Sequence, residues 1–114
     1  MTDKKQLSLL GLCRKADKLS LGHDASIGSI AVARAKVCLL CSDASQRLKA
    51  EFERAVSYDD RNIPLVFMPF TMEDIKNATG RNAAVLTIND EGFARSFLNL
   101  ERIRENNTGG KSTV

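Results

Sequence analysis

The chain has 114 residues, 43% of them apolar and 27% charged, which suits a single globular domain and excludes disorder along most of its length. The longest uninterrupted apolar run, residues 37–41, is far shorter than the roughly 18 residues of a membrane-spanning helix, so we expect no membrane partner. Three cysteines are an odd number for a disulfide framework and the N-terminal residues lack the apolar stretch of a secretory signal, so we expect a cytoplasmic protein.

Basic residues are concentrated in the first third of the chain. The 17 lysines and arginines exceed the 14 aspartates and glutamates, which gives a formal net charge of +3. Residues 4–36 hold seven of these bases and only two acids. This bias is compatible with nucleic acid as a partner, but by itself it does not indicate one.

Helix and strand patterns alternate along the chain. In chain order we predict a helix over residues 4–16, a short strand over 19–21, a helix that opens at 22–24 and a strand over 36–41. A helix capped within residues 42–45 follows, then a strand over 63–68, a helix from 72 to about 79, a strand over 83–88 and a helix that follows the cap Asn89. Thr71 and Asp74 resemble a capping box, and Gly80 suits the position after a helix end.

This alternation predicts an α/β protein. We expect a three-layer α/β/α sandwich around a central four-stranded mixed sheet in which most strand pairs are parallel. One domain is expected over residues 1–105, followed by a flexible polar tail over residues 106–114.

Three features that suggest chemistry have simpler explanations. Cys38 and Cys41 form a C-x-x-C pair, but residues three apart on a strand face opposite sides, so we expect buried structural thiols and no metal. Residues 109–112 resemble the end of a phosphate loop, yet Glu105 stands where that motif needs glycine. His23 is the only histidine and no spacing gives it a catalytic partner. We therefore predict neither an enzyme, nor a cofactor, nor a small-molecule substrate.

The junction at residues 19–24 is more informative. A helix that begins at Gly22 presents unpaired backbone N–H groups, which can bind a phosphate, and glycine permits close approach. The cations Arg14, Lys15, Lys18 and Lys36 lie nearby in sequence and are expected to contact phosphates. The alternative is an ordinary helix start with solvated lysines. Aromatic residues make up only 5% and tryptophan is absent, so folded RNA suits this chain better than single strands.

Four segments carry a family resemblance, in this order: residues 9–22 (LLGLCRKADKLSLG), 35–45 (AKVCLLCSDAS), 63–69 (IPLVFMP) and 90–94 (DEGFA). Together they resemble the YlxQ-like bacterial group of the ribosomal protein L7Ae/L30e family, over about residues 6–100. The resemblance implies binding of structured RNA, typically kink-turns, through the start of the second helix and the loop before the fourth. The residues that it adds as RNA contacts are His23, Asp24, Met68, Pro69 and Phe70.

The resemblance is incomplete at the start of the second helix. The family motif there reads Gly-x-Asn-Glu-x-x-Lys, whereas this chain has Asp24, Ala25 and Gly28 at the last three specified positions. Loss of one base contact and one phosphate contact weakens specific binding by roughly a hundredfold. Glycine inside a helix also costs about 1 kcal/mol relative to alanine, which suggests close packing at Gly28.

We therefore predict a small non-enzymatic RNA-binding protein, associated with ribosomal RNA or another structured RNA such as a kink-turn, with an atypical recognition motif. Ribosomal or other proteins are expected as further partners. The alternative is a protein-interaction module on the same fold that has lost kink-turn specificity.

Overall fold

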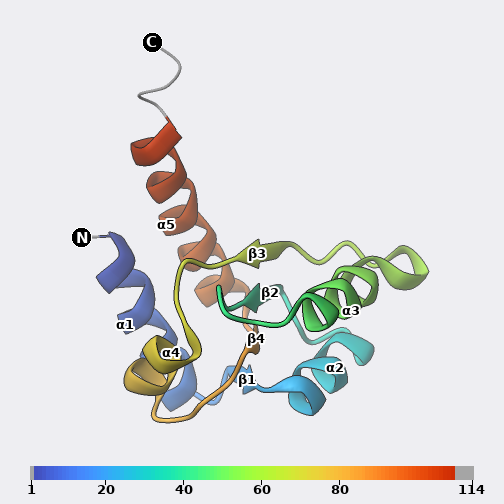
Figure 1. Ribbon diagram of the computed structural model, residues 1–114. Helices are drawn as coiled ribbons and strands as arrows, with labels where there is room; N and C mark the ends of the chain where they lie inside the picture. Colours follow the sequence, from blue (N-terminus) through green and yellow to red (C-terminus); the bar gives the residue numbers. More distant parts are fainter. Residues whose placement is uncertain (1, 110–114) are drawn as a thin grey trace.

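The computed structural model describes residues 2–109 and contains helices on both sides of a small sheet (Figure 1). The helices are α1 (Thr2–Lys15), α2 (His23–Ala31), α3 (Gln46–Ser57), the 3-10 helix η1 (Tyr58–Asp60), α4 (Met72–Thr79) and α5 (Glu91–Gly109). The strands are β1 (Leu19–Leu21), β2 (Val37–Leu40), β3 (Leu65–Phe67) and β4 (Val85–Ile88). The predicted order of helices and strands is confirmed, with η1 as an addition.

The four strands form one mixed sheet in the order β1-β4-β2-β3. β2 and β3 are parallel, while β4 is antiparallel to both of its neighbours. The mixed sheet is confirmed, but the expectation that most pairs are parallel is wrong. The reason is that β4 enters the sheet between β1 and β2 and runs in the direction opposite to both, which an alternation of helices and strands does not reveal.

The sheet separates two apolar clusters, which confirms the three layers. Helices α1, α4 and α5 cover one face through Leu10, Ile75 and Phe97, and α2 and α3 cover the other through Ile30 and Phe52 (Figure 1). Each of these side chains contributes roughly 1.5–3 kcal/mol when fully buried. The continuous apolar run of β2 is explained by this arrangement, since all four of its residues are buried.

Side-chain caps begin two helices as predicted. The Ser45 hydroxyl accepts a hydrogen bond from the Leu48 N–H (3.1 Å), and Thr71 and Asp74 form a complete capping box. Gly80 follows α4 in the left-handed conformation, with φ 86°, as expected for a residue after a helix end.

The predicted cap of the last helix is displaced by one residue. The carboxylate of Asp90, not the amide of Asn89, accepts the hydrogen bond from the Phe93 N–H (2.9 Å). Asn89 instead donates to the Ser20 hydroxyl and accepts from the Thr87 hydroxyl, both at 2.9 Å. Its side chain therefore links β1 and β4 and is not available to α5.

The last helix is longer than predicted. α5 continues to Gly109, so residues 106–109 belong to a helix and the expected tail does not begin at residue 106. Residues 110–114 lie outside the described part of the chain. Within residues 2–109, no helix combines the length and apolarity needed to cross a bilayer.

One end of the sheet gathers four connecting segments. The last residues of β1, β2 and β3 lie at this end, because Leu21 pairs with Leu86, and Leu40 pairs with both Val85 and Phe67. We call it the α2 end, since α2 begins there. It holds the start of α2 and residues 41–45, 68–71 and 80–84.

Candidate nucleic-acid interface

Helix α2 begins without a side-chain cap. Gly22 occupies the N-cap position with φ 99° and ψ 172°, a conformation that favours glycine, and no side chain accepts a hydrogen bond from the first turn. The first intrahelical bond runs from the Ser26 N–H to the Gly22 carbonyl (3.0 Å). The N–H groups of residues 23–25 precede that bond, so this helix start is suited to an anionic or hydrogen-bond-accepting ligand.

His23 connects this helix start to α3. Its Nδ1 lies 2.8 Å from Oδ1 of Asp24, and its Nε2 lies 2.7 Å from Oε2 of Glu51. The ring also packs edge-on against Phe52, with 5.7 Å between ring centroids. The hydrogen bonds to Asp24 and then to Glu51 raise the pKa of His23 above its ordinary 6.5. At the start of α2, the imidazole of His23 is therefore shared by two carboxylates, that of Asp24 in α2 and that of Glu51 in α3.

Backbone hydrogen bonds hold the other segments of the α2 end in place. The Gly22 N–H donates to the Val85 carbonyl (2.9 Å), which joins the start of α2 to the first residue of β4. The Cys41 N–H donates to Ala84 (2.9 Å), and the Ser42 N–H donates to Phe70 (2.8 Å). The start of α2 and the loop after β3 thus lie at the same end of the sheet, as the family resemblance implies.

Only one of the three residues predicted as RNA contacts in the loop after β3 is exposed. Met68 and Phe70 are only 2% and 4% exposed and belong to the core, so in this conformation they are not available for contact with RNA. Pro69 is exposed as predicted, and Phe67, the last residue of β3, is 49% exposed although it was not predicted as a contact. The reason is that the extended alternation of β3 continues past its end, which buries every second side chain.

The predicted cations do not gather around Gly22. Lys18 precedes β1 and Lys36 precedes β2, so both lie at the opposite end of the sheet. The four steps from residue 18 to residue 22 span about 13 Å in extended chain, which sequence proximity alone does not reveal. Lys15 is exposed at the C-terminal end of α1. The expected cradle of amide hydrogens and surrounding lysines is therefore not formed.

Arg14 is the exception among these cations. Its Nη1 donates to the carbonyl of Thr79, the last residue of α4, where it also complements the helix dipole. This places its guanidinium beside Gly80, in the connection that leads to β4. Arg81 is a further exposed cation in the same connection between α4 and β4. It was not predicted, because its place at this end of the sheet depends on the direction in which β4 runs.

The two departures from the family motif are both on the surface. Ala25 and Gly28 are exposed, and a Cβ built on Gly28 would meet no atom within 4 Å. The expectation of close packing at Gly28 is therefore wrong. Nothing in the described residues around this glycine requires its small size.

The cysteines lie in the interior. Cys38 and Cys41 belong to the clusters on opposite faces of the sheet, as predicted from their spacing, and Cys13, a residue of α1, is buried in the same cluster as Cys41. Burial raises the pKa of each thiol to about 12. Among residues 2–109, no group of three metal-binding side chains is suitably placed to hold an ion.

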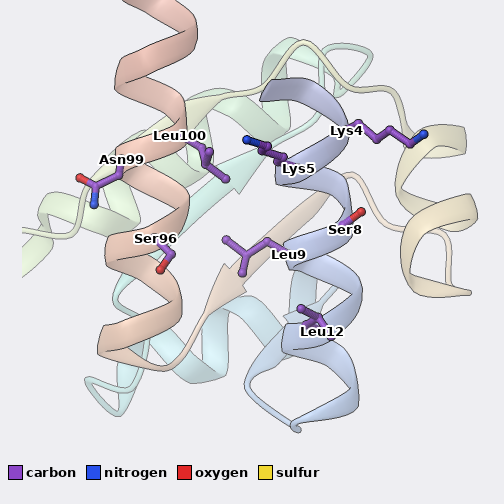
Figure 2. Close-up of a pocket in the computed structure, with 8 residues that line it drawn as sticks. All are labelled: Lys4, Lys5, Ser8, Leu9, Leu12, Ser96, Asn99 and Leu100. Carbon is purple, nitrogen blue, oxygen red and sulfur yellow. The ribbon is translucent and has the colours of Figure 1, made fainter. Parts of the chain in front are cut away.

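A hollow lies away from the sheet ends, between α1 and α5. It has a volume of about 660 Å³ and is lined by Leu9, Leu12 and Leu100 together with Lys4 and Lys5 (Figure 2). Polar Ser96 and Asn99 line the α5 side.

Comparisons with known proteins agree with the fold. The model of the ribosomal protein L7Ae/L30e/S12e/Gadd45 family matches residues 4–98. Two curated relatives are named RNA-binding protein YlxQ. The one from Enterococcus faecium is 32% identical over 97 residues, which cover 85% of this chain and 91% of the relative. The one from Bacillus subtilis (strain 168) is 29% identical over 105 residues, which cover 88% of this chain and 98% of the relative.

Solved structures are similar over most of the chain. A protein of unknown function from Bacillus halodurans C matches with a TM-score of 0.78 and 26% identity, covering 84% of this chain and 95% of that protein. A 15.5kD RNA-binding protein from Giardia lamblia matches with a TM-score of 0.66 and 13% identity, covering 87% of this chain and 83% of that protein. At that low identity the likeness shows a shared fold alone.

Proposed function

Since this chain belongs to the ribosomal protein L7Ae/L30e/S12e/Gadd45 family, we propose that it is a small RNA-binding protein of the cytoplasm without catalytic activity. The names of its relatives from Enterococcus faecium and Bacillus subtilis support RNA as the partner. Its RNA is structured, either a segment of ribosomal RNA or a kink-turn-like element.

The observation that carries this proposal is the juxtaposition at the α2 end. The uncapped start of α2 at Gly22, the exposed last residue of β3, Phe67, and the exposed loop residue Pro69 lie at the same end of the sheet. Backbone N–H groups bind phosphate or base-edge acceptors, while an exposed phenylalanine offers a surface on which a base can stack. One RNA element can therefore meet both in a single binding mode.

Asp24 supplies base recognition in this arrangement. One carboxylate oxygen is hydrogen-bonded to His23, and the side chain is otherwise fully exposed, so it can accept hydrogen bonds from a guanine edge. Ala25 and Gly28 supply neither a carboxylate nor a cation, so recognition is weaker than that of the complete motif. The resulting protein binds structured RNA with reduced kink-turn specificity.

A titration of single-site variants tests the α2 end. Phe67→Ala and Asp24→Ala are each expected to weaken binding of a kink-turn RNA by roughly tenfold, measured by fluorescence anisotropy. Ile103→Ala is a matched control, because Ile103 is 48% exposed but lies far along α5. Unchanged affinity in both test variants for every RNA would reject this interface and favour the alternative of a protein-interaction module.

A further inference from the structure

The opposite end of the sheet brings together cations that the sequence separates. The Asn89 N–H donates to the Lys18 carbonyl, and the Lys36 N–H donates to the Ile88 carbonyl, both at 2.8 Å. Lys18 and Lys36 therefore flank the C-terminal end of β4, one on the side of β1 and the other on the side of β2.

Two hollows extend this pair on either side. One, of about 230 Å³, is lined by Lys18, Arg34 and Asn89, with Asp17 at the same hollow. The other, of about 420 Å³, is lined by Lys36, Arg95 and Arg102. We call this surface the basic end; its five cations are Lys18, Arg34, Lys36, Arg95 and Arg102.

The charge of the basic end is not cancelled locally. Lys18, Arg34 and Lys36 are exposed, and within residues 2–109 none of them forms an ion pair. The two carboxylates that line the hollows are Asp17 and Glu91, and Glu91 lies 3.6 Å from Arg95. Asp90, which directly follows Asn89, is a third carboxylate at this end, so five cations stand against three carboxylates and leave a local excess of two. The basic end therefore carries a net positive charge.

The dimensions of this surface suit a nucleic-acid backbone. Four strand ends, at about 4.8 Å from one strand to the next, span about 14 Å. This width is enough to meet more than one phosphate of a nucleic-acid strand. No aromatic residue lines either hollow, so a stacking platform for single-stranded bases is lacking among the lining residues. Charge without stacking favours the backbone of a duplex.

We propose that the basic end is a second RNA-contacting surface, which binds the phosphate backbone of an RNA duplex while the α2 end holds the structured element. The proposal rests on the RNA-binding function proposed above. Because the two surfaces lie at opposite ends of the sheet, a single protein joins two segments of RNA and so stabilises a folded arrangement of both.

The proposal is tested with a triple variant and a control of equal charge. Lys18→Gln, Arg34→Gln and Lys36→Gln are combined in one protein, and Lys4→Gln, Arg54→Gln and Lys76→Gln in the other, which removes three exposed cations on α1, α3 and α4. The probe is a 20-base-pair RNA duplex without a kink-turn. Loss of three phosphate contacts is expected to reduce the slope of log K against log salt by about 2.7 and the affinity at 0.1 M salt by at least a hundredfold.

A bridging assay then distinguishes one RNA surface from two. An immobilised kink-turn RNA should retain a labelled duplex in the presence of the wild-type protein but not of the basic-end triple variant. That variant should still bind the kink-turn RNA itself. Thermal unfolding verifies the fold of both triple variants. The single variants Lys18→Gln and Lys36→Gln should each reduce the slope of log K against log salt for the duplex by about 0.9.

Three outcomes would overturn the proposal. Equal losses of duplex affinity in the two triple variants would show a general effect of charge, and would leave the proposed function intact. Binding of phosphatidylglycerol vesicles in preference to the duplex would assign the basic end to a membrane surface. Failure of the wild-type protein to bind either RNA at 50 mM salt would reject this surface and the proposed function together.

Discussion

Nε2 of His23, the first residue of α2, lies 2.7 Å from Oε2 of Glu51 in α3. Nδ1 of the same ring lies 2.8 Å from Oδ1 of Asp24. Only a protonated imidazole donates from both nitrogens, so this geometry favours the imidazolium form. One ring thus connects two helices at the surface where we propose that RNA binds, and its charge offsets the carboxylates beside it.

This geometry predicts a pH dependence. The pKa of His23 is raised above 6.5, so the stability that the two hydrogen bonds contribute is fully present below pH 6.5 and is lost as the pH rises through the raised pKa. Since His23 is the only histidine, a single imidazole resonance in a proton NMR titration reports its pKa. Glu51→Gln should lower that pKa, because it removes one of the two carboxylates. A pKa at or below 6.5 in the wild-type protein would contradict the geometry.

Two glycines in helices are predicted to differ in their tolerance of a methyl group. A Cβ at Gly11 would lie 2.8 Å from the carbonyl oxygen of Ala78, a backbone atom that cannot give way without moving α4. Gly11→Ala should therefore destabilise the protein by roughly 1–3 kcal/mol, measured by urea unfolding. A Cβ at Gly28 would meet nothing within 4 Å, so Gly28→Ala should stabilise it by up to about 1 kcal/mol. Equal effects of the two changes would argue against the close approach of α1 and α4.

Local signals in the sequence were sufficient for most of the fold. The apolar run of β2 predicts a strand buried on both faces, and the spacing of Cys38 and Cys41 predicts that their side chains point to opposite faces. The capping box of Thr71 and Asp74 fixes the start of α4. Each of these features depends on residues that are close in sequence, so it can be predicted without knowledge of the strand order in the sheet.

The candidate site was less predictable because it depends on long-range pairing. Whether Phe67 or Met68 faces solvent is set by the register of β3 against β2, and an apolar run of several residues does not reveal that register. The distance from Lys18 to Gly22 depends on the chain being extended in β1, and the nearness of Lys18 to Lys36 depends on β4 lying between them. The prediction that a helix starts at Gly22 is therefore correct, whereas the prediction that Lys18 and Lys36 lie around that helix start is wrong.

The cysteines are predicted to be unreactive in the folded protein. Burial raises the pKa of Cys13, Cys38 and Cys41 to about 12, so almost no thiolate is present at neutral pH. Labelling with Ellman's reagent at pH 8 should be slow in buffer and should reach three thiols per chain in denaturant. A thiol that reacts rapidly in buffer would show that one of these positions opens readily.

The missing lysine of the family motif can be restored. Gly28 is exposed on α2, four residues after Asp24, and has open space around it, so Gly28→Lys should be accommodated without displacement of neighbours. One added phosphate contact should steepen the slope of log K against log salt by about 0.9 and raise the affinity for a kink-turn RNA roughly eightfold at 0.1 M salt.

Gly28→Gln is the matched control, because it gains the same helix propensity without charge. It should stabilise the fold as much as Gly28→Lys does and leave RNA affinity unchanged. Equal affinities of the two variants, measured by anisotropy, would show that bound RNA does not pass beside this face of α2.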